Sequence, residues 1–250
     1  MIADPLHVAI LAGGLATRLR PLTQTIPKAL IDINGEPFIA HQLRLLKTAG
    51  IKKVVICAGY LGQMIQDVVG DGRQFGLEVK FVFDGDRLLG TGGAIKNALP
   101  QLGDTFFVLY GDSYLTCDYS AVQQTFEGSG CRALMTVYCN KGAWDTSNVE
   151  FGHGRIINYD KKNISPQMHH IDYGLGVFRA VAFSSVPNDD PYDLAELYQE
   201  LLRSRDLAGY EVAERFYEIG SLQGLEELRR LLSPSPDFLD NSKRDSIPGA

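Results

Sequence analysis

The chain has 250 residues, of which 45% are hydrophobic and 22% charged, and its formal net charge at pH 7 is −6. Such a composition is typical of a globular protein with one large or two small domains. The acidic balance argues against general nucleic-acid binding, which needs a basic surface. No run approaches the ~18 uninterrupted apolar residues of a membrane span, and the first residues lack the pattern of a signal peptide. We therefore expect a cytoplasmic protein that binds neither membrane nor nucleic acid.

The first half of the chain alternates between strand-like and helix-like segments. Strands are predicted over residues 8–12, 54–58, 77–83 and 105–110, and helices over residues 38–49 and 93–99. This alternation predicts an α/β fold with a mostly parallel sheet that is covered on both faces. In such sheets, ligands bind at the carboxyl ends of the strands.

The second half predicts a different arrangement. Short strands, broken by Gly, Asn and Asp, are predicted over residues 133–139, 149–151, 155–159 and 173–178, and helices over about 193–203 and 222–232. Such short strands favour an antiparallel or mixed extension of the sheet over further βαβ units. Residues 233–250 are polar and turn-rich, which is typical of a flexible tail.

The first strand runs directly into Leu11-Ala12-Gly13-Gly14, and cations follow it at Arg18, Arg20 and Lys28. The two glycines let the backbone turn sharply and lie close to a ligand. Exposed N–H groups and nearby cations suit a polyphosphate, so we interpret this stretch as a site for a nucleoside triphosphate. The alternative is an ordinary turn with solvated cations. Neither the dinucleotide-binding glycine motif nor a P-loop is present.

Two further glycine-containing turns are candidates for ligand contacts. Gly111-Asp112 follows the strand over 105–110, where a carboxylate is well placed to hold Mg²⁺. Its alternative role is that of a turn or helix-capping aspartate. In Leu89–Ala94, three glycines and Thr91 would let a base or sugar approach closely, although a capping turn would have the same composition.

The second half offers weaker candidates. Lys161 follows a predicted strand and could bind a phosphate, although most such lysines are simply solvated. Glu218, just before a predicted helix, could supply a second metal ligand or stabilise the start of that helix. His169 and His170 are adjacent, and adjacent strand residues face opposite ways, so we do not expect the pair to bind one metal. The four cysteines contain no Cys-x-x-Cys pair and are interpreted as reduced thiols in or near the core.

Taken together, these segments resemble the sugar-1-phosphate nucleotidylyltransferases. The defining motif is matched by Leu11-Ala12-Gly13-Gly14-x-x-Thr17-Arg18-Leu19-x-Pro21-Leu22-Thr23-x-x-x-Pro27-Lys28. The match continues in order through Ala58-Gly59-Tyr60, Leu89–Ala94, Gly111-Asp112, Asn148-Val149-Glu150, Asp172-Tyr173-Gly174 and Glu218-Ile219-Gly220. It covers residues 7 to about 232.

The resemblance implies a Rossmann-like, glycosyltransferase-A type fold: a three-layer sandwich with a mostly parallel central sheet and a small antiparallel extension. One domain would span residues 1–232, with a nucleotide-binding half (about 1–115) and a sugar-phosphate-binding half (about 116–232), before a tail over 233–250. The implied reaction is attack of a sugar 1-phosphate oxygen on the α-phosphate of a nucleoside triphosphate, with release of pyrophosphate. A homo-oligomer remains possible.

The resemblance also assigns roles by position. Arg18, Lys28 and Asp112 would be catalytic, and Asp112 and Glu218 would hold Mg²⁺. The nucleotide would be bound by Leu11, Ala12, Gly13, Gly14, Thr17, Gly59, Gly90, Thr91 and Gly111. The sugar phosphate would be bound by Asn148, Glu150, Lys161, Asp172 and Gly174.

Two departures from the family pattern affect the second half. Glu218-Ile219-Gly220 replaces the usual Asp-x-Gly, and Asp160-Lys161-Lys162 replaces Glu-Lys-Pro, which removes a rigid proline turn. Within the family, the chain looks most like the D-glycero-D-manno-heptose 1-phosphate guanylyltransferases, which favours GTP as the nucleotide. Thymidylyl-, uridylyl- or guanylyltransferases of hexose 1-phosphates (glucose, mannose or N-acetylmuramate) are the alternative. A non-catalytic, nucleotide-sugar-binding regulatory subunit is an alternative of another class.

Overall fold

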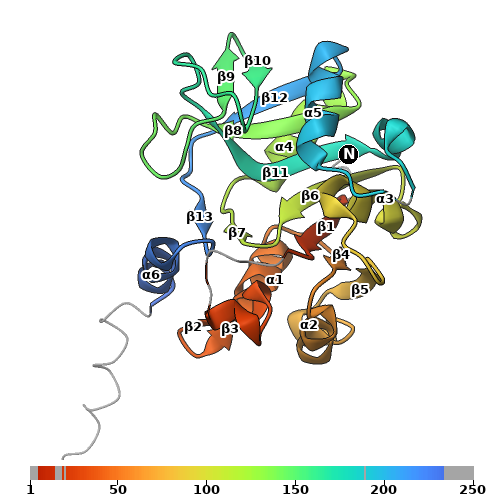
Figure 1. Cartoon of the computed structure of the whole chain (residues 1–250), viewed down its shortest axis with the longest axis vertical. Helices are drawn as coiled ribbons and strands as arrows, with labels where there is room; N and C mark the ends of the chain where they lie inside the picture. The colour runs from red at the N-terminus through yellow and green to blue at the C-terminus, as the bar shows by residue number, and fades with distance from the viewer. Residues whose placement is uncertain (1–4, 15–18, 20, 189, 234–250) are drawn as a thin grey trace, which may run out of the picture.

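A computed structural model describes residues 5–14, 19, 21–188 and 190–233. Its centre is a seven-stranded sheet with the order β12-β8-β11-β6-β1-β4-β5 (Figure 1). The strands are β1 (His7–Ala12), β4 (Lys53–Ala58), β5 (Glu78–Phe83), β6 (Thr105–Tyr110), β8 (Ala133–Tyr138), β11 (Ile171–Arg179) and β12 (Leu207–Val212). Neighbouring strands of this sheet are parallel, except that β11 is antiparallel to both β6 and β8. The mostly parallel sheet is thus confirmed.

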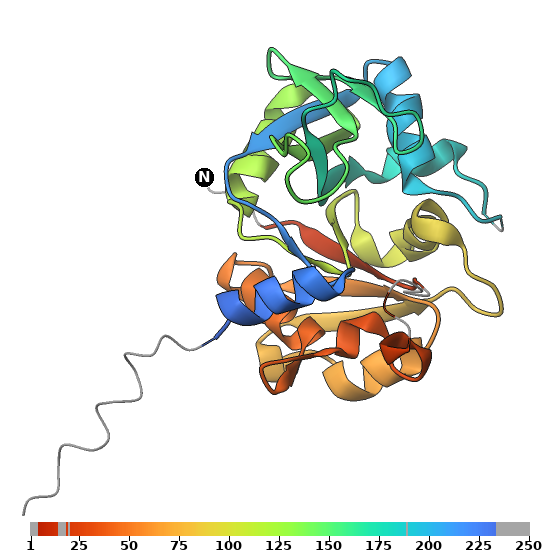
Figure 2. The ribbon, with the colours of Figure 1, turned by 60° about the vertical axis from the view of Figure 1, so that its left-hand side comes forward.

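Helices cover both faces of the sheet, which confirms the three-layer α/β sandwich (Figures 1 and 2). One face packs against α1 (Phe38–Thr48), α2 (Gly62–Val69) and α4 (Tyr119–Ser129), and the other against α3 (Gly90–Leu102) and α5 (Leu194–Arg203). The alternation along β1 shows how a doubly covered strand is built: Val8 and Ile10 enter one buried cluster and Ala9 the other. Both faces are apolar, so the strand reads as a continuous hydrophobic run.

The second half extends the same sheet. β8, β11 and β12 are added beyond β6, while β9 (Val149–Gly152) and β10 (Arg155–Tyr159) form a separate antiparallel hairpin. The mixed extension agrees with the expectation from the sequence, which nevertheless missed β12, α2 and α4. It also placed the start of α3 three residues late, because the glycines of its first turn looked like loop. A 3₁₀ helix, η5 (Ala180–Ser185), connects β11 to the segment before α5.

The last described elements return to the first half of the chain. β13 (Tyr217–Glu218) pairs with β7 (Ser113–Tyr114), and α6 (Leu222–Leu231) packs beside the small hairpin of β2 (Asp32–Ile33) and β3 (Glu36–Pro37) (Figure 1). Leu225 and Leu228 of α6 share a buried cluster with Ile33 and Phe38. The predicted tail lies outside the described residues except for Ser233. Among the described helices, none is long and apolar enough to cross a membrane.

Candidate active site

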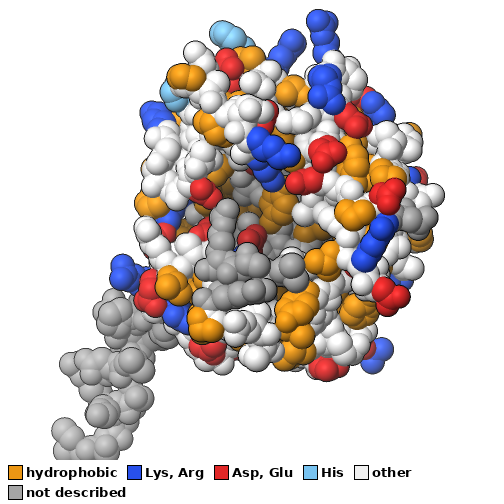
Figure 3. Space-filling view, viewed as in Figure 1, with side chains coloured by type: hydrophobic (Ala, Val, Ile, Leu, Met, Phe, Trp, Pro, Cys, Tyr) orange, Lys and Arg blue, Asp and Glu red, His pale blue; other side chains and the backbone are white. Residues whose placement is uncertain are grey.

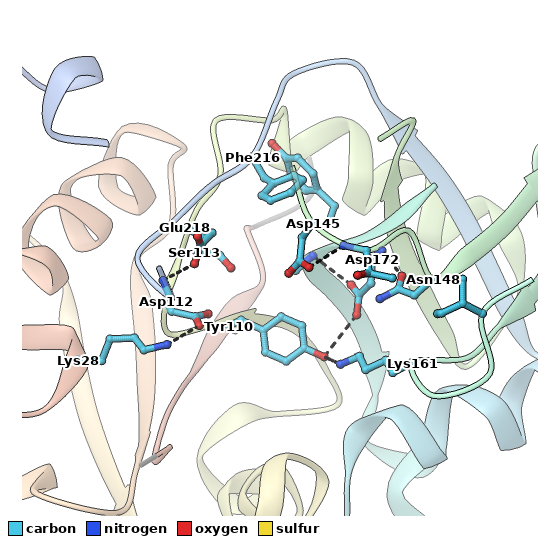
Figure 4. A pocket seen from close by; sticks show the side chains of 15 residues that line it. Lys28, Tyr110, Asp112, Ser113, Asp145, Asn148, Lys161, Asp172, Phe216 and Glu218 are labelled. Carbon is cyan, nitrogen blue, oxygen red and sulfur yellow. Dashed lines mark hydrogen bonds and ion pairs between the residues drawn. The ribbon is translucent and has the colours of Figure 1, made fainter. Parts of the chain in front are cut away.

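A pocket of about 610 Å³ lies at the edge of the sheet where the parallel strands end (Figure 4). Its wall includes Lys28, Tyr110, Asp112, Lys161, Asp172 and Glu218. The direction of β11 explains how distant segments meet here. Because β11 runs against its neighbours, its first residues lie beside the last residues of β6 and β8. Figure 3 shows this side of the molecule hollowed, with acidic and basic side chains around the opening.

Two smaller pockets adjoin the large one. A pocket of about 80 Å³ is lined by Leu11, Ala12, Gly14, Lys28, Ala29, Gly111 and Asp112. Another of about 260 Å³ is lined mainly by Leu11, Gly13, Gly14, Asp84, Leu88, Gly90, Thr91, Gly111 and Asp112. Asp112 lines all three pockets, and Lys28 lines both the large one and the smallest. The site is therefore divided into compartments that meet at one carboxylate.

The ion pair of Lys28 and Asp112 stands at this junction. Lys28 Nζ lies 3.0 Å from Asp112 Oδ2, and both side chains are partly exposed (Figure 4). Lys28 begins the short 3₁₀ helix η3 (Lys28–Leu30), and Asp112 occupies the turn between β6 and β7. The backbone N–H of Ile219 donates to the Asp112 carbonyl oxygen at 2.9 Å, so the returning C-terminal segment holds this turn.

Gln42 supports the same turn and was missed in the sequence. It is 1% exposed, and its Nε2 donates to the carbonyl oxygens of Ser113 (2.8 Å) and Tyr110 (3.2 Å). These bonds bracket Asp112 on both sides and limit its movement. The available signal was a polar residue on the apolar face of the helix over 38–49, because a buried amide needs hydrogen-bond partners.

Glu218 lies next to Asp112 because β13 pairs with β7, which places Glu218 opposite Ser113. Its carboxylate accepts hydrogen bonds from the Gly220 N–H and from the Ser221 hydroxyl at 2.7 Å. Ser221 in turn is the N-cap of α6. Glu218 therefore contacts the start of α6, in agreement with the alternative role that the sequence suggested for it. Two carboxylates on one wall are also the donor type that Mg²⁺ prefers.

The opposite wall is organised around Asp172 (Figure 4). Its Oδ1 accepts from the Gly174 N–H at 3.0 Å, and its Oδ2 lies 3.4 Å from the hydroxyl groups of both Tyr110 and Tyr159. Burial raises the pKa of Asp172, although the nearby Lys161 ammonium acts in the opposite direction. Lys161 Nζ donates to the Tyr110 hydroxyl at 3.4 Å, so its charge is held over the pocket.

Asn148 joins this wall through its side chain, because Asn148 Oδ1 accepts the Asp172 N–H at 2.9 Å. Glu150 lies on β9 and does not line any of the three pockets. A β-carbon at Gly174 would be 3.1 Å from the Ser113 Oγ, and the φ angle of Gly174 is +96°. Glycine is therefore required where the two walls approach each other.

Two of the predicted nucleotide-binding residues, Gly59 and Thr91, make structural contacts within the protein. Gly59 lies against the backbone of Gly13, where there is no room for a side chain. The Thr91 hydroxyl accepts from the Leu194 N–H (2.8 Å) and donates to Asp193 (3.0 Å), so it joins the starts of α3 and α5. Thr17 and Arg18 lie outside the described residues, so their predicted roles remain predictions.

Asp84 is a second residue that the sequence reasoning missed. It lines the 260 Å³ pocket, and its Oδ2 accepts the Leu89 N–H at 3.2 Å. Burial raises the pKa of Asp84, because the charged carboxylate loses water there. A ligand group that donates a hydrogen bond to this carboxylate would offset that loss. The signal was available, because Asp84 directly follows the strand over 77–83 and thus lies at the ligand-binding edge of the sheet.

The fold and the site define an α/β protein with a charged, compartmented ligand pocket at the carboxyl ends of its parallel strands. Residues 7–229 match the nucleotidyl transferase family, and the chain belongs to this family. It is 28% identical to the N-acetylmuramate alpha-1-phosphate uridylyltransferase of Neisseria meningitidis over 228 residues, covering 89% of this chain and 96% of the relative. It is also 28% identical to the D-glycero-alpha-D-manno-heptose 1-phosphate guanylyltransferase of Campylobacter jejuni, covering 86% and 95%.

Solved structures agree on the fold. HddC from Yersinia pseudotuberculosis, complexed with GMP-PN, superposes with a TM-score of 0.76 at 24% identity, covering 91% of this chain and all of that one. A Bacillus anthracis protein in complex with sucrose gives a TM-score of 0.80 at 20% identity, covering 93% and 98%. The chain is thus a nucleotidyl transferase by family and shares the fold of these solved structures. The two sequence relatives are equally similar to the chain, at 28% identity, but their names differ in both sugar and base. Both are named as transferases, and neither is named as a regulatory subunit.

Proposed function

We propose that the enzyme transfers GMP from GTP to D-glycero-D-manno-heptose 1-phosphate, and that this reaction takes place around Asp112. The observation that carries the placement of the transfer is the meeting of three pockets at Asp112, with Lys28 paired to it. A bisubstrate transfer needs separate places for the two substrates and a shared point where their phosphates react. A pocket of 610 Å³ is also large enough for a sugar phosphate.

In the proposed reaction, a phosphate oxygen of the sugar 1-phosphate attacks the α-phosphorus of GTP. A new P–O bond forms, the bond between the α-phosphorus and its bridging oxygen breaks, and pyrophosphate leaves with that electron pair. Such transfers depend mainly on positioning and charge neutralisation. Lys28 faces both the large and the smallest pocket and would neutralise the reacting phosphates, while Arg18 would bind the departing pyrophosphate.

The acidic wall fits a hard divalent cation. Asp112 would hold Mg²⁺, with Glu218 beside it, and this ion would supply positive charge to the phosphate oxygens. The protein supplies the rest of the arrangement: Gln42 and Ile219 hold the turn that carries Asp112, and the Lys28 ammonium already pairs with its carboxylate.

The sugar side would be formed by Lys161, Asp172 and Asn148. Lys161 supplies a point charge over the pocket that suits the sugar phosphate. Asp172 is held by donors from Tyr110, Tyr159 and Gly174, so it would present a fixed carboxylate to the sugar. Its raised pKa reflects incomplete compensation of the buried charge, and a sugar hydroxyl is a donor that would improve it.

Asp84 supports guanine as the base. The 260 Å³ pocket places this carboxylate beside Gly13, where an added β-carbon would lie 3.4 Å from Asp84 Oδ2. The Watson–Crick edge of guanine offers two adjacent N–H donors, which a carboxylate can accept together. Uracil and thymine offer one N–H between two carbonyl oxygens, and those oxygens would be repelled by the carboxylate. Leaving a buried polar group unpaired weakens the binding of the wrong base.

A substrate panel tests the proposal. Pyrophosphate release is measured with GTP, UTP, dTTP and CTP against heptose, glucose, mannose and N-acetylmuramate 1-phosphates in the presence of Mg²⁺. We expect GTP with the heptose phosphate to give a kcat/KM at least about 100-fold above pairs with another base. A preference for a hexose phosphate or for UTP would contradict the substrate assignment. Nucleotide binding without turnover for any pair would favour a regulatory protein.

A further inference from the structure

Cys139, His170 and Glu211 form a cluster beside the candidate active site. One ligand atom of each residue, namely a sulfur, a ring nitrogen and a carboxylate oxygen, lies within 4.8 Å of the other two. His170 Nε2 is 3.1 Å from Glu211 Oε1. None of these residues lines the three pockets described above. The proposed transfer reaction therefore does not account for the cluster.

The sheet register explains why three residues so far apart in sequence meet. Tyr138 pairs with Ile171 of antiparallel β11, so the next residue, Cys139, lies opposite His170. Glu211 of parallel β12 pairs with Val137, which is two residues before Cys139 and hence on the same face. All three side chains thus lie on one face at the ends of three adjacent strands. His169 is not part of this cluster, which agrees with the expectation that the two adjacent histidines do not bind one metal.

The three groups are of the types that bind a thiophilic divalent cation. Thiolate, imidazole and carboxylate bind Zn²⁺ at about 2.0–2.3 Å, so tetrahedral geometry separates the ligand atoms by roughly 3.3–3.8 Å. The His170–Glu211 separation of 3.1 Å is close to this range and the other separations do not exceed 4.8 Å, so small side-chain rotations would complete the site. The His170 side chain is only 12% exposed and packs on the Phe151 ring at 5.3 Å, which fixes its orientation. Glu211 is 48% exposed, so an ion can enter and a water can complete its coordination.

We propose that Cys139, His170 and Glu211 bind Zn²⁺ or a similar thiophilic cation. The site would fix both ends of the segment over residues 139–148, because the N–H groups of Asn148 and Val149 donate to the His170 carbonyl oxygen. This segment carries Asp145, Thr146 and Asn148 to the wall of the large pocket. The ion would thus position this wall of the pocket. The assignment of the wall to the sugar rests on the proposed function, whereas binding of the ion does not.

Cobalt titration tests ion binding directly. The reduced, full-length protein is titrated with Co²⁺ in excess Mg²⁺, which does not compete for a thiolate. We expect one equivalent to produce a thiolate-to-cobalt charge-transfer band that Zn²⁺ abolishes. Cys139→Ser and His170→Ala should lose the band, and Glu211→Gln should weaken cobalt binding at least about tenfold. His169→Ala and Asp112→Asn are the matched controls and should keep it. Absence of a saturable band, or a normal band in Cys139→Ser, would overturn the proposal.

A second measurement needs no variant. Zn²⁺ should slow the alkylation of Cys139 in the wild-type protein, while Cys131, which is also partly exposed, reacts at an unchanged rate. Equal rates for Cys139 with and without Zn²⁺ would overturn the site. Removal of Zn²⁺ should also raise the KM for the sugar phosphate several-fold and leave that for the nucleotide unchanged. An unchanged sugar KM beside an intact cobalt band would contradict the assignment of this wall to the sugar, and not the ion site.

Discussion

Two aspartates at equivalent places in the fold have different surroundings. Asp84 and Asp112 each follow the end of a parallel strand, β5 and β6 respectively, and both line the 260 Å³ pocket. Asp112 is paired with the Lys28 ammonium, whereas Asp84 accepts the Leu89 N–H, and burial raises its pKa. A cation-paired carboxylate suits phosphate and metal chemistry, and a buried one suits neutral N–H donors.

Substitution of Asp84 tests this division. Asp84→Asn keeps the shape of the side chain but removes one acceptor, so the two donors of guanine can no longer both be satisfied. We expect kcat/KM for GTP to fall by about 5- to 150-fold, which corresponds to the cost of about 1–3 kcal/mol for one unpaired buried group. The value for UTP should fall less or rise. Equal losses for both nucleotides, measured by pyrophosphate release, would show that Asp84 does not read the base.

The pH dependence of folding stability tests whether the Asp172 carboxyl is buried. Because burial raises its pKa in the folded state, the native protein binds more protons than the unfolded chain between the unfolded pKa of about 3.9 and the raised value. This contribution therefore favours the folded state at low pH and is lost as the pH rises. Asp172→Asn removes it.

We expect the stability of Asp172→Asn relative to the wild type to increase from pH 4 towards pH 7, measured by urea unfolding at each pH. Asp160→Asn is a suitable control, because turn hydrogen bonds lower the pKa of this exposed carboxyl and the trend should be opposite. A difference for Asp172→Asn that does not change with pH, or that decreases, would contradict the burial argument.

At the level of elements, the site depends on the close approach of strand ends. Gly111 donates its N–H to the Leu11 carbonyl oxygen at 3.0 Å, and a β-carbon at this position would overlap that oxygen. Gly111→Ala should therefore push the ends of β1 and β6 apart and destabilise the protein by about 1–3 kcal/mol, the usual cost of overpacking.

The matched control is Gly128→Ala at an exposed position of α4, where an added β-carbon meets nothing within 4 Å. This change should stabilise the protein by about 0.5–1 kcal/mol, because alanine favours the helix. Denaturant midpoints report both effects. A Gly111→Ala protein as stable as the wild type would show that the strand ends can separate freely.

Elements with strong local patterns could be predicted from the sequence. The continuous apolar run of β1 identifies a doubly covered strand, and the helix over 38–49 has a clear apolar face. α4 was missed although Asp118 caps it, accepting the Ala121 N–H, and Gly130 ends it. β12 contains a central glycine and only a weak alternation, since its stability comes from pairing with β8 rather than from local preference.

For the whole molecule, topology decides which residues form the site. The sequence motifs pointed to Lys28, Asp112 and Asp172 separately, and the resemblance grouped them before their geometry was known. Their meeting depends on the reversed direction of β11, which brings Asp172 to the edge where β1 and β6 end. The return of β13 to β7 likewise brings Glu218 beside Asp112. Such pairings join segments far apart in the chain, so no local pattern encodes them.

The same reasoning explains the cluster of Cys139, His170 and Glu211. Inspection of the sequence directed attention to the neighbouring histidines, whereas the sheet uses one of them together with residues from two other strand ends. The nine-residue β11 therefore organises both sites, since His170 precedes it and Asp172 is its second residue. A change in the position of the first residues of β11 would therefore move Asp172 in the pocket wall and His170 in the cluster together.

The most direct test of the central claim compares pyrophosphate release by the wild type and by Asp112→Asn with the preferred substrate pair and Mg²⁺. Among the residues that the structure describes, Asp112 alone lines all three pockets, and its carboxylate is proposed to hold the ion that neutralises the phosphates. We predict a loss of at least about 10³-fold in kcat for a variant whose circular dichroism and thermal unfolding match those of the wild type. A folded Asp112→Asn enzyme that releases pyrophosphate at a near-normal rate would contradict the placement of the reaction at this carboxylate.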